Sequence, residues 1–387
     1  MSSNLDSTSS TASPPDSPNP PMAIATRIPP ELLLYIFSVV SNSPSEGSEV
    51  YFERNRNLKY LALVHSAWKD SAQQILQEEV FIPGTDSGEA SDEEVGRIAM
   101  LLLDSKLEGT KYLTVDAHLN DLIARTGCAM WSQIRYANLL TSSRNDGTTQ
   151  LSDFASFPRL QYLQLDDFTG ASNLLWFDPS DVNLQFPYLH RIILGLRVRI
   201  GSLSQPEAKD DAWEGDLATL IPITHQLFSP SNMPNLVHLA LYGYSETTLP
   251  THMILLAKVL PQITTLAIIG TGFDLDVLSP ENRLPDNLRH LSLNIDDSDL
   301  LSLFSDDGMD LESLHLSSWT MKRDGEVMSR LIRIAKGADP TNTIMRIVVY
   351  GKRKEIEAIY KDLVDDLDSL EWREDSEHPP FEDFDGR

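Results

Sequence analysis

Three histidines come closest to supporting acid–base or metal chemistry in this chain. His238, His290 and His315 each stand beside a leucine-rich segment, and on adjacent strands their positions would be roughly 4.8 Å apart per strand. Imidazole titrates near neutral pH and is a common metal ligand. No further ligands accompany the three at a metal-binding spacing. We therefore expect each to be a surface or hydrogen-bonded histidine.

Other reactive residue types also lack a catalytic context. The adjacent acids Asp166–Asp167, Asp296–Asp297 and Asp306–Asp307 are typical of turns, and the single cysteine, Cys128, has no activating neighbour. The phosphate-binding, dinucleotide-binding, nucleophile-elbow and zinc-protease motifs are absent from the sequence. We predict no catalytic residue, no metal and no cofactor; a deep polar pocket with clustered acids or histidines would revive an enzymatic interpretation.

The charge balance narrows the classes of partner. The 387 residues include 31 basic and 57 acidic side chains, a net charge of −26. Nucleic acids and anionic membranes bind through cationic side chains, so we expect neither as a partner. No segment reaches the roughly 18–20 apolar residues of a membrane span, and no signal peptide is evident. A cytoplasmic or nuclear protein is expected, with the acidity serving mainly solubility.

A leucine pattern recurs through most of the chain and identifies the elements that must position any site. Apolar residues stand at positions 1, 4 and 6, often after an apolar–proline pair, as in Phe157-Pro158 before Leu160, Leu163 and Leu165. The position-4 residues of the copies are Leu113, Ala137, Leu163, Ile192, Leu239, Leu266, Leu291, Leu314 and Ile347. Most spacings fall in the roughly 20–29-residue range of leucine-rich repeats.

The spacing of positions 4 and 6 predicts short strands with one buried face, because side chains alternate along a strand. Stacking the copies would give a curved parallel sheet whose helical or irregular returns cover the other side, an irregular leucine-rich-repeat-like solenoid. The wide spacing between Ile192 and Leu239 indicates an insertion or an extra helix. A non-repetitive α/β domain with several leucine-rich strands is the alternative.

Residues between the leucines should point to the opposite face and are candidates for binding a protein substrate. Tyrosine and arginine are enriched in interface hot spots. The residues we predict for substrate contact are Tyr162, Arg191, His238, Tyr242, His290, His315, Arg346 and Tyr350. The same face also carries Tyr112, Thr114, Tyr136, Asn138, Gln164, Asp166 and Asn294. A solvated face without a dedicated partner is the alternative for any one of them.

The segment 27–82 has a different, helical pattern. Pro29 and Pro30 suit a helix start, and Leu32, Leu33, Ile36, Phe37 and Val40 follow at helical spacing. Two more short helical patterns run through 58–64 and 68–76. Three short helices bury little surface by themselves, so this segment should complete its core against another protein or against the rest of the chain.

These residues resemble an F-box. The start Ile28-Pro29-Pro30-Glu31-Leu32-Leu33, the helix through Leu63-Val64 and the third helix with Ala67-Trp68 and Ala72 are similar to the F-box-like proteins abundant in mushroom-forming fungi. Ile28 stands where leucine is usual, and the segment 41–57 is longer than in compact F-boxes. A three-helix capping subdomain is the alternative.

The resemblance implies a substrate-recognition subunit of an SCF-type ubiquitin ligase. Such a subunit binds a Skp-type adaptor, and through it a cullin scaffold, and contributes no covalent chemistry. The residues that the resemblance assigns to the adaptor contact are Pro29, Leu32, Leu33, Ile36, Phe37, Leu61, Val64 and Trp68; some of them must instead hold the helices together. The alternative is a non-catalytic leucine-rich-repeat scaffold with no ubiquitin role.

The expected organisation has four parts: a disordered tail at 1–26, rich in Ser and Pro; an F-box-like helical domain at 27–82; the solenoid at 83–370; and an acidic tail at 371–387. The acidic tail carries Trp372, Phe381 and Phe384, so a strand or cap on the last repeat is the alternative for it.

Overall fold

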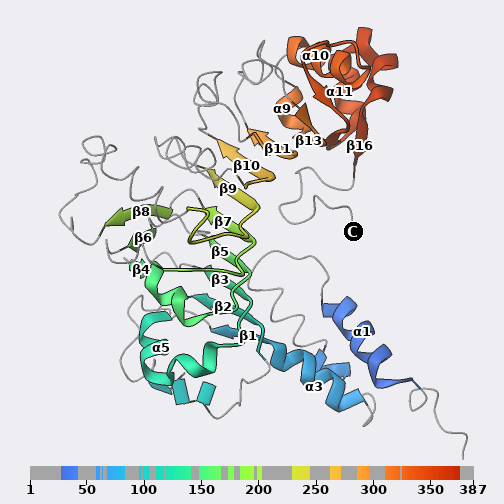
Figure 1. Ribbon diagram of the computed structural model, residues 1–387. Coiled ribbons are helices and arrows are strands. Elements are labelled where there is room, and N and C mark those ends of the chain that lie inside the picture. The colour runs from blue at the N-terminus through green and yellow to red at the C-terminus, as the bar shows by residue number, and fades with distance from the viewer. Residues whose placement is uncertain are drawn as a thin grey trace, which may run out of the picture. The chain divides into compact units, whose positions relative to one another are not determined.

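The computed structural model separates the chain into two units, Met1–Gln77 and Glu78–Arg387 (Figure 1). The structure describes residues 28–41, 58–61, 63, 68–82, 96–97, 99–100, 102–103, 110–116, 119–140, 148–166, 173–177, 184–195, 198–202, 229–244, 262–271, 286–295, 310–322 and 325–374. The predicted tail at 1–26 and residue Val64 lie outside these ranges. Within the described part, no helix has the length and apolar character needed to cross a bilayer.

The described residues of the first unit include α1 (Pro30–Ser41), α3 (Lys69–Glu78) and a helical stretch at 58–61. Proline opens α1 because the first turn needs no N–H from it. The carbonyl of Pro29 accepts hydrogen bonds from the amides of Leu32 and Leu33, each at 3.0 Å. The core of this unit is small and consists of Leu33, Phe37, Leu58, Ala72 and Ile75.

The second unit is built on one sheet of 11 strands, which confirms the predicted α/β architecture with a large parallel sheet. Every neighbouring pair is parallel, and the strands follow one another across the sheet in chain order (Figure 1). They are β1 (Glu79–Ile82), β2 (Tyr112–Asp116), β3 (Tyr136–Leu140), β5 (Tyr162–Asp166), β7 (Arg191–Gly195), β9 (His238–Tyr244), β10 (Thr265–Thr271), β11 (His290–Ile295), β13 (Ser313–Ser317), β15 (Ile347–Tyr350) and β16 (Glu371–Arg373).

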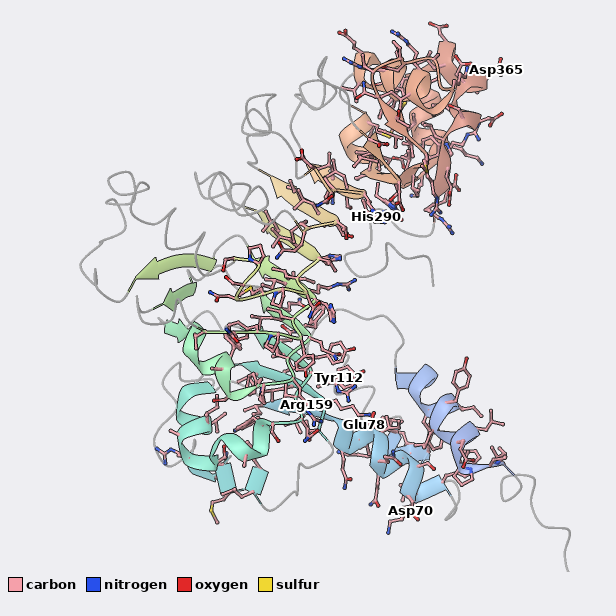
Figure 2. All side chains as sticks on the ribbon, in the orientation of Figure 1. Asp70, Glu78, Tyr112, Arg159, His290 and Asp365 are labelled. Atoms are coloured by element: carbon pink, nitrogen blue, oxygen red, sulfur yellow. The ribbon has the colours of Figure 1, made fainter. Side chains whose placement is uncertain are left out.

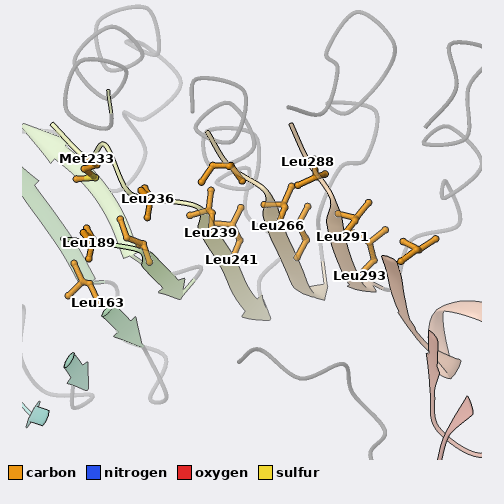
Figure 3. Close-up of a cluster of buried hydrophobic side chains, with 14 of the residues drawn as sticks. Leu163, Leu189, Met233, Leu236, Leu239, Leu241, Leu266, Leu288, Leu291 and Leu293 are labelled. Carbon is orange, nitrogen blue, oxygen red and sulfur yellow. The ribbon is translucent and has the colours of Figure 1, made fainter. Parts of the chain in front are cut away.

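The position-4 residues of the leucine pattern form one continuous row across this sheet. Leu239 pairs with Leu266, Leu266 with Leu291, and Leu291 with Leu314 (Figure 3). The same row continues from Leu113 at one end to Ile347 at the other. A one-residue slip would turn every leucine to the opposite face, so this shared register keeps all of them in a single core.

The apolar–proline pair before each strand has a local explanation. The amide of Leu160 donates to the carbonyl of Phe157 at 3.0 Å, which closes a four-residue turn with Pro158 at its second position, where the fixed φ of proline is favoured. The same turn recurs when the amide of Leu189 donates to the carbonyl of Phe186 at 3.2 Å. These turns place both the phenylalanine and the first leucine of each copy in the core.

Smaller elements surround the main sheet. A second parallel sheet contains β4 (Thr148–Gln150), β6 (Asn173–Phe177) and β8 (Val198–Ser202), and a third joins β12 (Asp310–Leu311) to β14 (Thr343–Ile344). The helices among the described residues of this unit include α5 (Leu119–Thr126), α9 (Ser318–Met321), α10 (Gly325–Ala335) and α11 (Arg353–Ile359), with 3-10 helices η4 (Cys128–Trp131), η5 (Leu151–Ser156) and η10 (Lys361–Ser369). Side chains from α5, α10, α11 and η10 share one apolar core with the leucine rows.

Two boundaries differ from the expected ones. Glu79–Ile82, expected to close the helical domain, pairs with β2 and is the first strand of the sheet. Glu371–Arg373, expected to begin the acidic tail with a strand on the last repeat as the alternative, pairs with β15 as the last strand. In both places the unsatisfied main-chain edge of the neighbouring strand takes up the extra segment. Residues 375–387 lie outside the described ranges.

Candidate binding face of the sheet

The face opposite the leucine rows carries one row of polar and aromatic residues that precede the position-4 residues. In register, Tyr112, Tyr136, Tyr162 and Arg191 are followed by His238, Thr265, His290 and Ser313. Neighbouring members of such a row stand about 4.8 Å apart, so their side chains can interact directly. Figure 2 labels two members of this row, Tyr112 on β2 and His290 on β11.

The first end of the row is a stack of three tyrosines. The rings of Tyr112 and Tyr136 are 4.5 Å apart and nearly parallel, at 16°, and Tyr162 follows at 5.9 Å with a tilt of 41°. The guanidinium carbon of Arg191 lies 5.8 Å from the centre of the Tyr162 ring, within the range of a cation–π contact. Tyr112 is 39% exposed. This end of the face offers aromatic surface with an arginine beside it.

The middle of the row is buried, which corrects the expectation that His238 would be presented to a partner. His238 is 5% exposed, and its neighbours Ile193, Ala240 and Ala267 form a small apolar cluster with Tyr162 on the same face. Burial, followed by the charge of Arg191 and by His290, lowers the pKa of His238 to about 3. The imidazole is therefore neutral at physiological pH. Tyr242 lies in β9, and its side chain is outside the described residues.

The far end of the row holds a chain of hydrogen bonds across three strands. Ser313 Oγ lies 2.8 Å from His290 Nδ1 and 3.0 Å from His315 Nε2, and His315 Nδ1 lies 3.0 Å from the hydroxyl of Tyr350. A neutral imidazole has one donor and one acceptor, and a hydroxyl can do both. The four side chains can therefore each donate to the next in one direction, and their hydrogen bonds connect β11, β13 and β15.

His315 and Tyr350 also differ from the expectation, because they are buried at 3% and 8% exposure. Their rings stack at 5.8 Å and 27°. Burial lowers the pKa of His315 to about 4, helped by the positive charge of Arg346 and by His290. These two residues stabilise the sheet from within, and their buried side chains do not form a contact surface.

Serine, histidine and glutamate meet at this end in an order that resembles a catalytic triad. His290 Nε2 lies 3.7 Å from Glu312 Oε2, and its Nδ1 faces Ser313. Ser313 is 4% exposed, and its hydroxyl is shared between two imidazoles. A nucleophile needs access to its substrate, so the arrangement fits a structural tie between strands better than catalysis.

Arg346 and Glu371 form a two-pronged ion pair at the far end of the sheet. Arg346 Nε and Nη2 donate to the two carboxylate oxygens of Glu371, both at 2.6 Å. This two-pronged bond raises the pKa of Arg346 and lowers that of Glu371. Arg346, predicted as a substrate contact, is bonded here to the first residue of β16 and links this strand to the segment that precedes β15. Glu371 was missed because its segment was assigned to the tail.

The described residues include histidine and acidic side chains of the kinds that bind metal ions. Among them, no group of three or more histidine, cysteine, aspartate or glutamate side chains is placed to hold a metal ion. His238 and His315 stand on β9 and β13, with β10 and β11 between them. The three predicted histidines thus share a face without converging on one point.

The residues that the resemblance assigns to an adaptor divide into two groups in the helical unit. Leu33 and Phe37 are 2% and 1% exposed and belong to its core, with Trp68 meeting Phe37 edge-on at 5.8 Å. Leu32 and Ile36 are 48% and 39% exposed. Pro29 is also exposed, and Leu61 is half-buried. Sequence spacing identified the whole apolar set, and the structure separates its inner members from its outer ones.

Comparison with known proteins adds no family to this picture: no family model, no curated protein and no solved structure matches the chain.

Proposed function

We propose that this chain is the substrate-recognition subunit of an SCF-type ubiquitin ligase. In this proposal the helical unit acts as an F-box that binds a Skp-type adaptor and, through it, a cullin scaffold. The 11-stranded sheet is the body of an irregular leucine-rich-repeat solenoid that holds a protein substrate. The chain's contribution to ubiquitin transfer is proximity, because it raises the concentration of the substrate near the ubiquitin-carrying enzyme.

The observation that carries the adaptor proposal is the outer face of α1. Leu32, Tyr35 and Ile36 are 48%, 66% and 39% exposed, and their spacing places them on one side of the helix. Leu63, two residues beyond the helical stretch at 58–61, is 82% exposed. Large apolar side chains gathered on so small a unit are typical of a protein–protein contact.

The sheet supports the substrate part of the proposal through its repetition. The copies supply the strands of one parallel sheet, and their described position-4 residues lie in one core in which neighbouring copies contact one another. Such an array leaves a long row of side chains on the opposite face, and three tyrosines with one arginine follow one another there. This composition is typical of interface hot spots.

The test is recovery of the adaptor on the full chain. We expect Leu32→Asp/Ile36→Asp to reduce adaptor binding by tenfold or more, since burial of each side chain contributes about 1.5–3 kcal/mol. Gln73→Asp/Gln74→Asp adds the same two charges at exposed positions of α3 and should bind like the wild type. Phe37 is unsuitable for this test because a charge there would disrupt the core.

Equal recovery of the adaptor by the wild type and the Leu32→Asp/Ile36→Asp variant would refute the proposed contact. Absence of any adaptor binding by the wild type would favour the non-catalytic scaffold, in which the helical unit has no ubiquitin role. Isothermal titration with purified adaptor separates the two outcomes, because it measures the affinity of each variant directly.

A further inference from the structure

One end of the binding face is lined by tyrosine rings. Tyr112 and Tyr136 stack with their ring centres 4.5 Å apart, Tyr162 follows at 5.9 Å, and Arg191 continues the row on β7. Tyr112 is 39% exposed, and Tyr136 and Tyr162 are half-buried. We call these three tyrosines and Arg191 the tyrosine patch.

The direction in which the rings stack decides what a ligand meets at this patch. The 4.5 Å between the rings of Tyr112 and Tyr136 is close to the roughly 4.8 Å between neighbouring strands. The two rings are therefore stacked across the strands, nearly parallel at 16°, and cover each other's faces. A ligand on this side of the sheet meets ring edges and hydroxyl groups that repeat once per strand.

The side chains next to the rings are neutral. Two residues further along the same three strands, Thr114, Asn138 and Gln164 pair in register on the same face. All three are half-buried, and Gln164 Oε1 accepts a hydrogen bond from the hydroxyl of Tyr162 at 2.9 Å. These residues give the patch an uncharged surface in a chain whose net charge is −26.

The two ends of the patch differ in charge. On β7 the guanidinium carbon of Arg191 lies 5.8 Å from the centre of the Tyr162 ring, and the face closes on the next strand, where His238 is 5% exposed. At the opposite end, Glu79 on β1 takes the register position next to Tyr112, and its side chain lies outside the described residues. Guanidinium groups bind carboxylates through charge-assisted hydrogen bonds. A ligand carboxylate would therefore be placed at the β7 end.

A polyproline II helix has a repeat that matches the spacing of this row. It has three residues per turn and rises about 3.1 Å per residue, so residues i and i+3 lie on one side about 9.3 Å apart. Tyr112 and Tyr162 are two strand steps apart, or roughly 9.6 Å. In a β-strand, side chains on one side recur every roughly 6.6–6.8 Å and would fall out of step with these two rings.

Proline also matches the patch chemically. Proline-rich segments bind to surfaces lined by aromatic side chains, and their affinity benefits because the helix is already formed before binding. The main chain of such a helix makes no internal hydrogen bonds. Its carbonyl oxygens can therefore accept from the hydroxyl of Tyr136 and from the side-chain amide of Asn138, which lie in the middle of the patch.

We propose that the tyrosine patch binds a proline-rich segment in the polyproline II conformation, with prolines at i and i+3 over Tyr112 and Tyr162. A glutamate or aspartate follows on the side of Arg191, which is one strand step from Tyr162 and hence about one or two residues of such a helix away. The inference rests on the proposed role of the sheet as substrate receptor, since it names the class of segment that the sheet recognises. It involves none of the residues assigned to the adaptor contact.

The experiment measures fluorescence anisotropy of labelled synthetic peptides titrated with the full chain. The reference peptide has prolines at i and i+3, alanines between them and a glutamate two residues beyond one proline. It is made with the glutamate at either end, because the helix can lie in either direction. A second peptide has its prolines at i and i+2, a third replaces both prolines by alanine, and a fourth replaces the glutamate by lysine. We expect the better reference peptide to bind at least about tenfold more tightly than the alanine peptide and about threefold more tightly than the other two.

Single substitutions at tyrosines supply the matched variants. Tyr112→Ala removes the exposed ring of the patch and should weaken the reference peptide about tenfold, whereas Tyr112→Phe keeps the ring and should retain most of the binding. Tyr188→Ala removes a ring that is 53% exposed in the turn before β7 and should leave binding within about twofold. Arg191→Gln should abolish the preference for glutamate over lysine. Circular dichroism checks that each variant folds.

Four binding results would overturn the inference: equal binding of the alanine peptide, tighter binding of the peptide with prolines at i and i+2, no binding of either reference peptide, or an equal loss in Tyr112→Ala and Tyr188→Ala. Sedimentation velocity tests the other occupant, a second copy of the chain. A wild-type dimer that Tyr112→Ala dissociates would assign the patch to self-association and also overturn the inference.

The peptide assay and the adaptor assay fail independently. The peptide assay contains no adaptor, so its failure leaves adaptor binding intact as a separate measurement. Conversely, a chain that fails to bind the adaptor can still bind the proline-rich peptide.

Discussion

The buried histidine of β13 makes the stability of the sheet depend on pH in a window that carboxylates alone would not produce. His315 is 3% exposed, hydrogen-bonded to Ser313 and Tyr350, and has a pKa of about 4 because of burial and then the charge of Arg346. In the unfolded chain its pKa returns to 6.5. As the pH falls below 6.5, the unfolded chain takes up the proton first.

The sign and size of the change in unfolding free energy follow from the difference between these two pKa values. The stabilisation is fully present above pH 6.5 and is lost as the pH falls toward 4, where the native imidazole also protonates. Between pH 7 and pH 5 the linkage relation gives a loss of about 2 kcal/mol for His315. His238, with a pKa of about 3, should contribute a similar loss over the same interval.

Urea unfolding followed by tryptophan fluorescence measures the effect. The wild type should lose several kcal/mol between pH 7 and pH 5, and His315→Gln should lose about 2 kcal/mol less over that interval, whatever its stability at pH 7. An NMR titration of the histidine ring protons in the native wild type provides a second measurement. An unchanged pH dependence in the variant, or a native His315 that titrates near 6.5, would refute the reasoning.

Three further predictions concern single positions of the second unit. Gly351 has φ +123°, and a Cβ there would overlap the side chain of Ser318, so Gly351→Ala should cost about 2–5 kcal/mol by thermal unfolding. Gly337→Ala, at φ +66° with no atom within 4 Å, should cost only about 1–2 kcal/mol; equal costs would exclude the close contact as the cause. Asp339 Oδ1 accepts hydrogen bonds from the amides of residues 341 and 342 and from their side chains, which hold the pKa of Asp339 well below the usual range. Asp339→Ala should therefore cost about 2–3 kcal/mol at pH 7. In urea unfolding, the difference in stability from wild type should shrink below pH 4, because the carboxyl of the unfolded chain protonates first. Leu266 is fully buried in the middle of the leucine row. Leu266→Ala should lower the free energy of unfolding by about 3–4 kcal/mol, and a loss under 1 kcal/mol in chemical denaturation would contradict its place in the core.

The rows of the sheet could be predicted from the sequence because each copy repeats the same physical constraint. In five copies an apolar–proline pair marks where a strand begins, and apolar residues two apart determine which side is buried. Register across the sheet then follows from burying Leu239, Leu266 and Leu291 together. Asn173–Phe177 and Val198–Ser202 carry no such marker, so the second sheet was not predicted.

The candidate site was less predictable because alternation along a strand specifies the face and leaves its exposure open. Tyr112 and His315 share the same face, yet one is 39% exposed and the other 3%. The difference depends on the neighbours: His315 bonds to Ser313 on its own strand and to Tyr350 on the next. Contacts between strands that lie far apart in the sequence cannot be predicted from the residue spacing within one repeat.

The strict agreement between strand order and chain order has a consequence for how the protein is made. A ribosome releases the amino-terminal strands first, so each new strand of the main sheet emerges when its hydrogen-bonding neighbour already exists. No strand of that sheet has to wait for a later one to be inserted between two earlier ones. Synthesis can therefore lengthen the sheet at a single advancing edge. A chain stalled partway would already carry its completed strands in their final order.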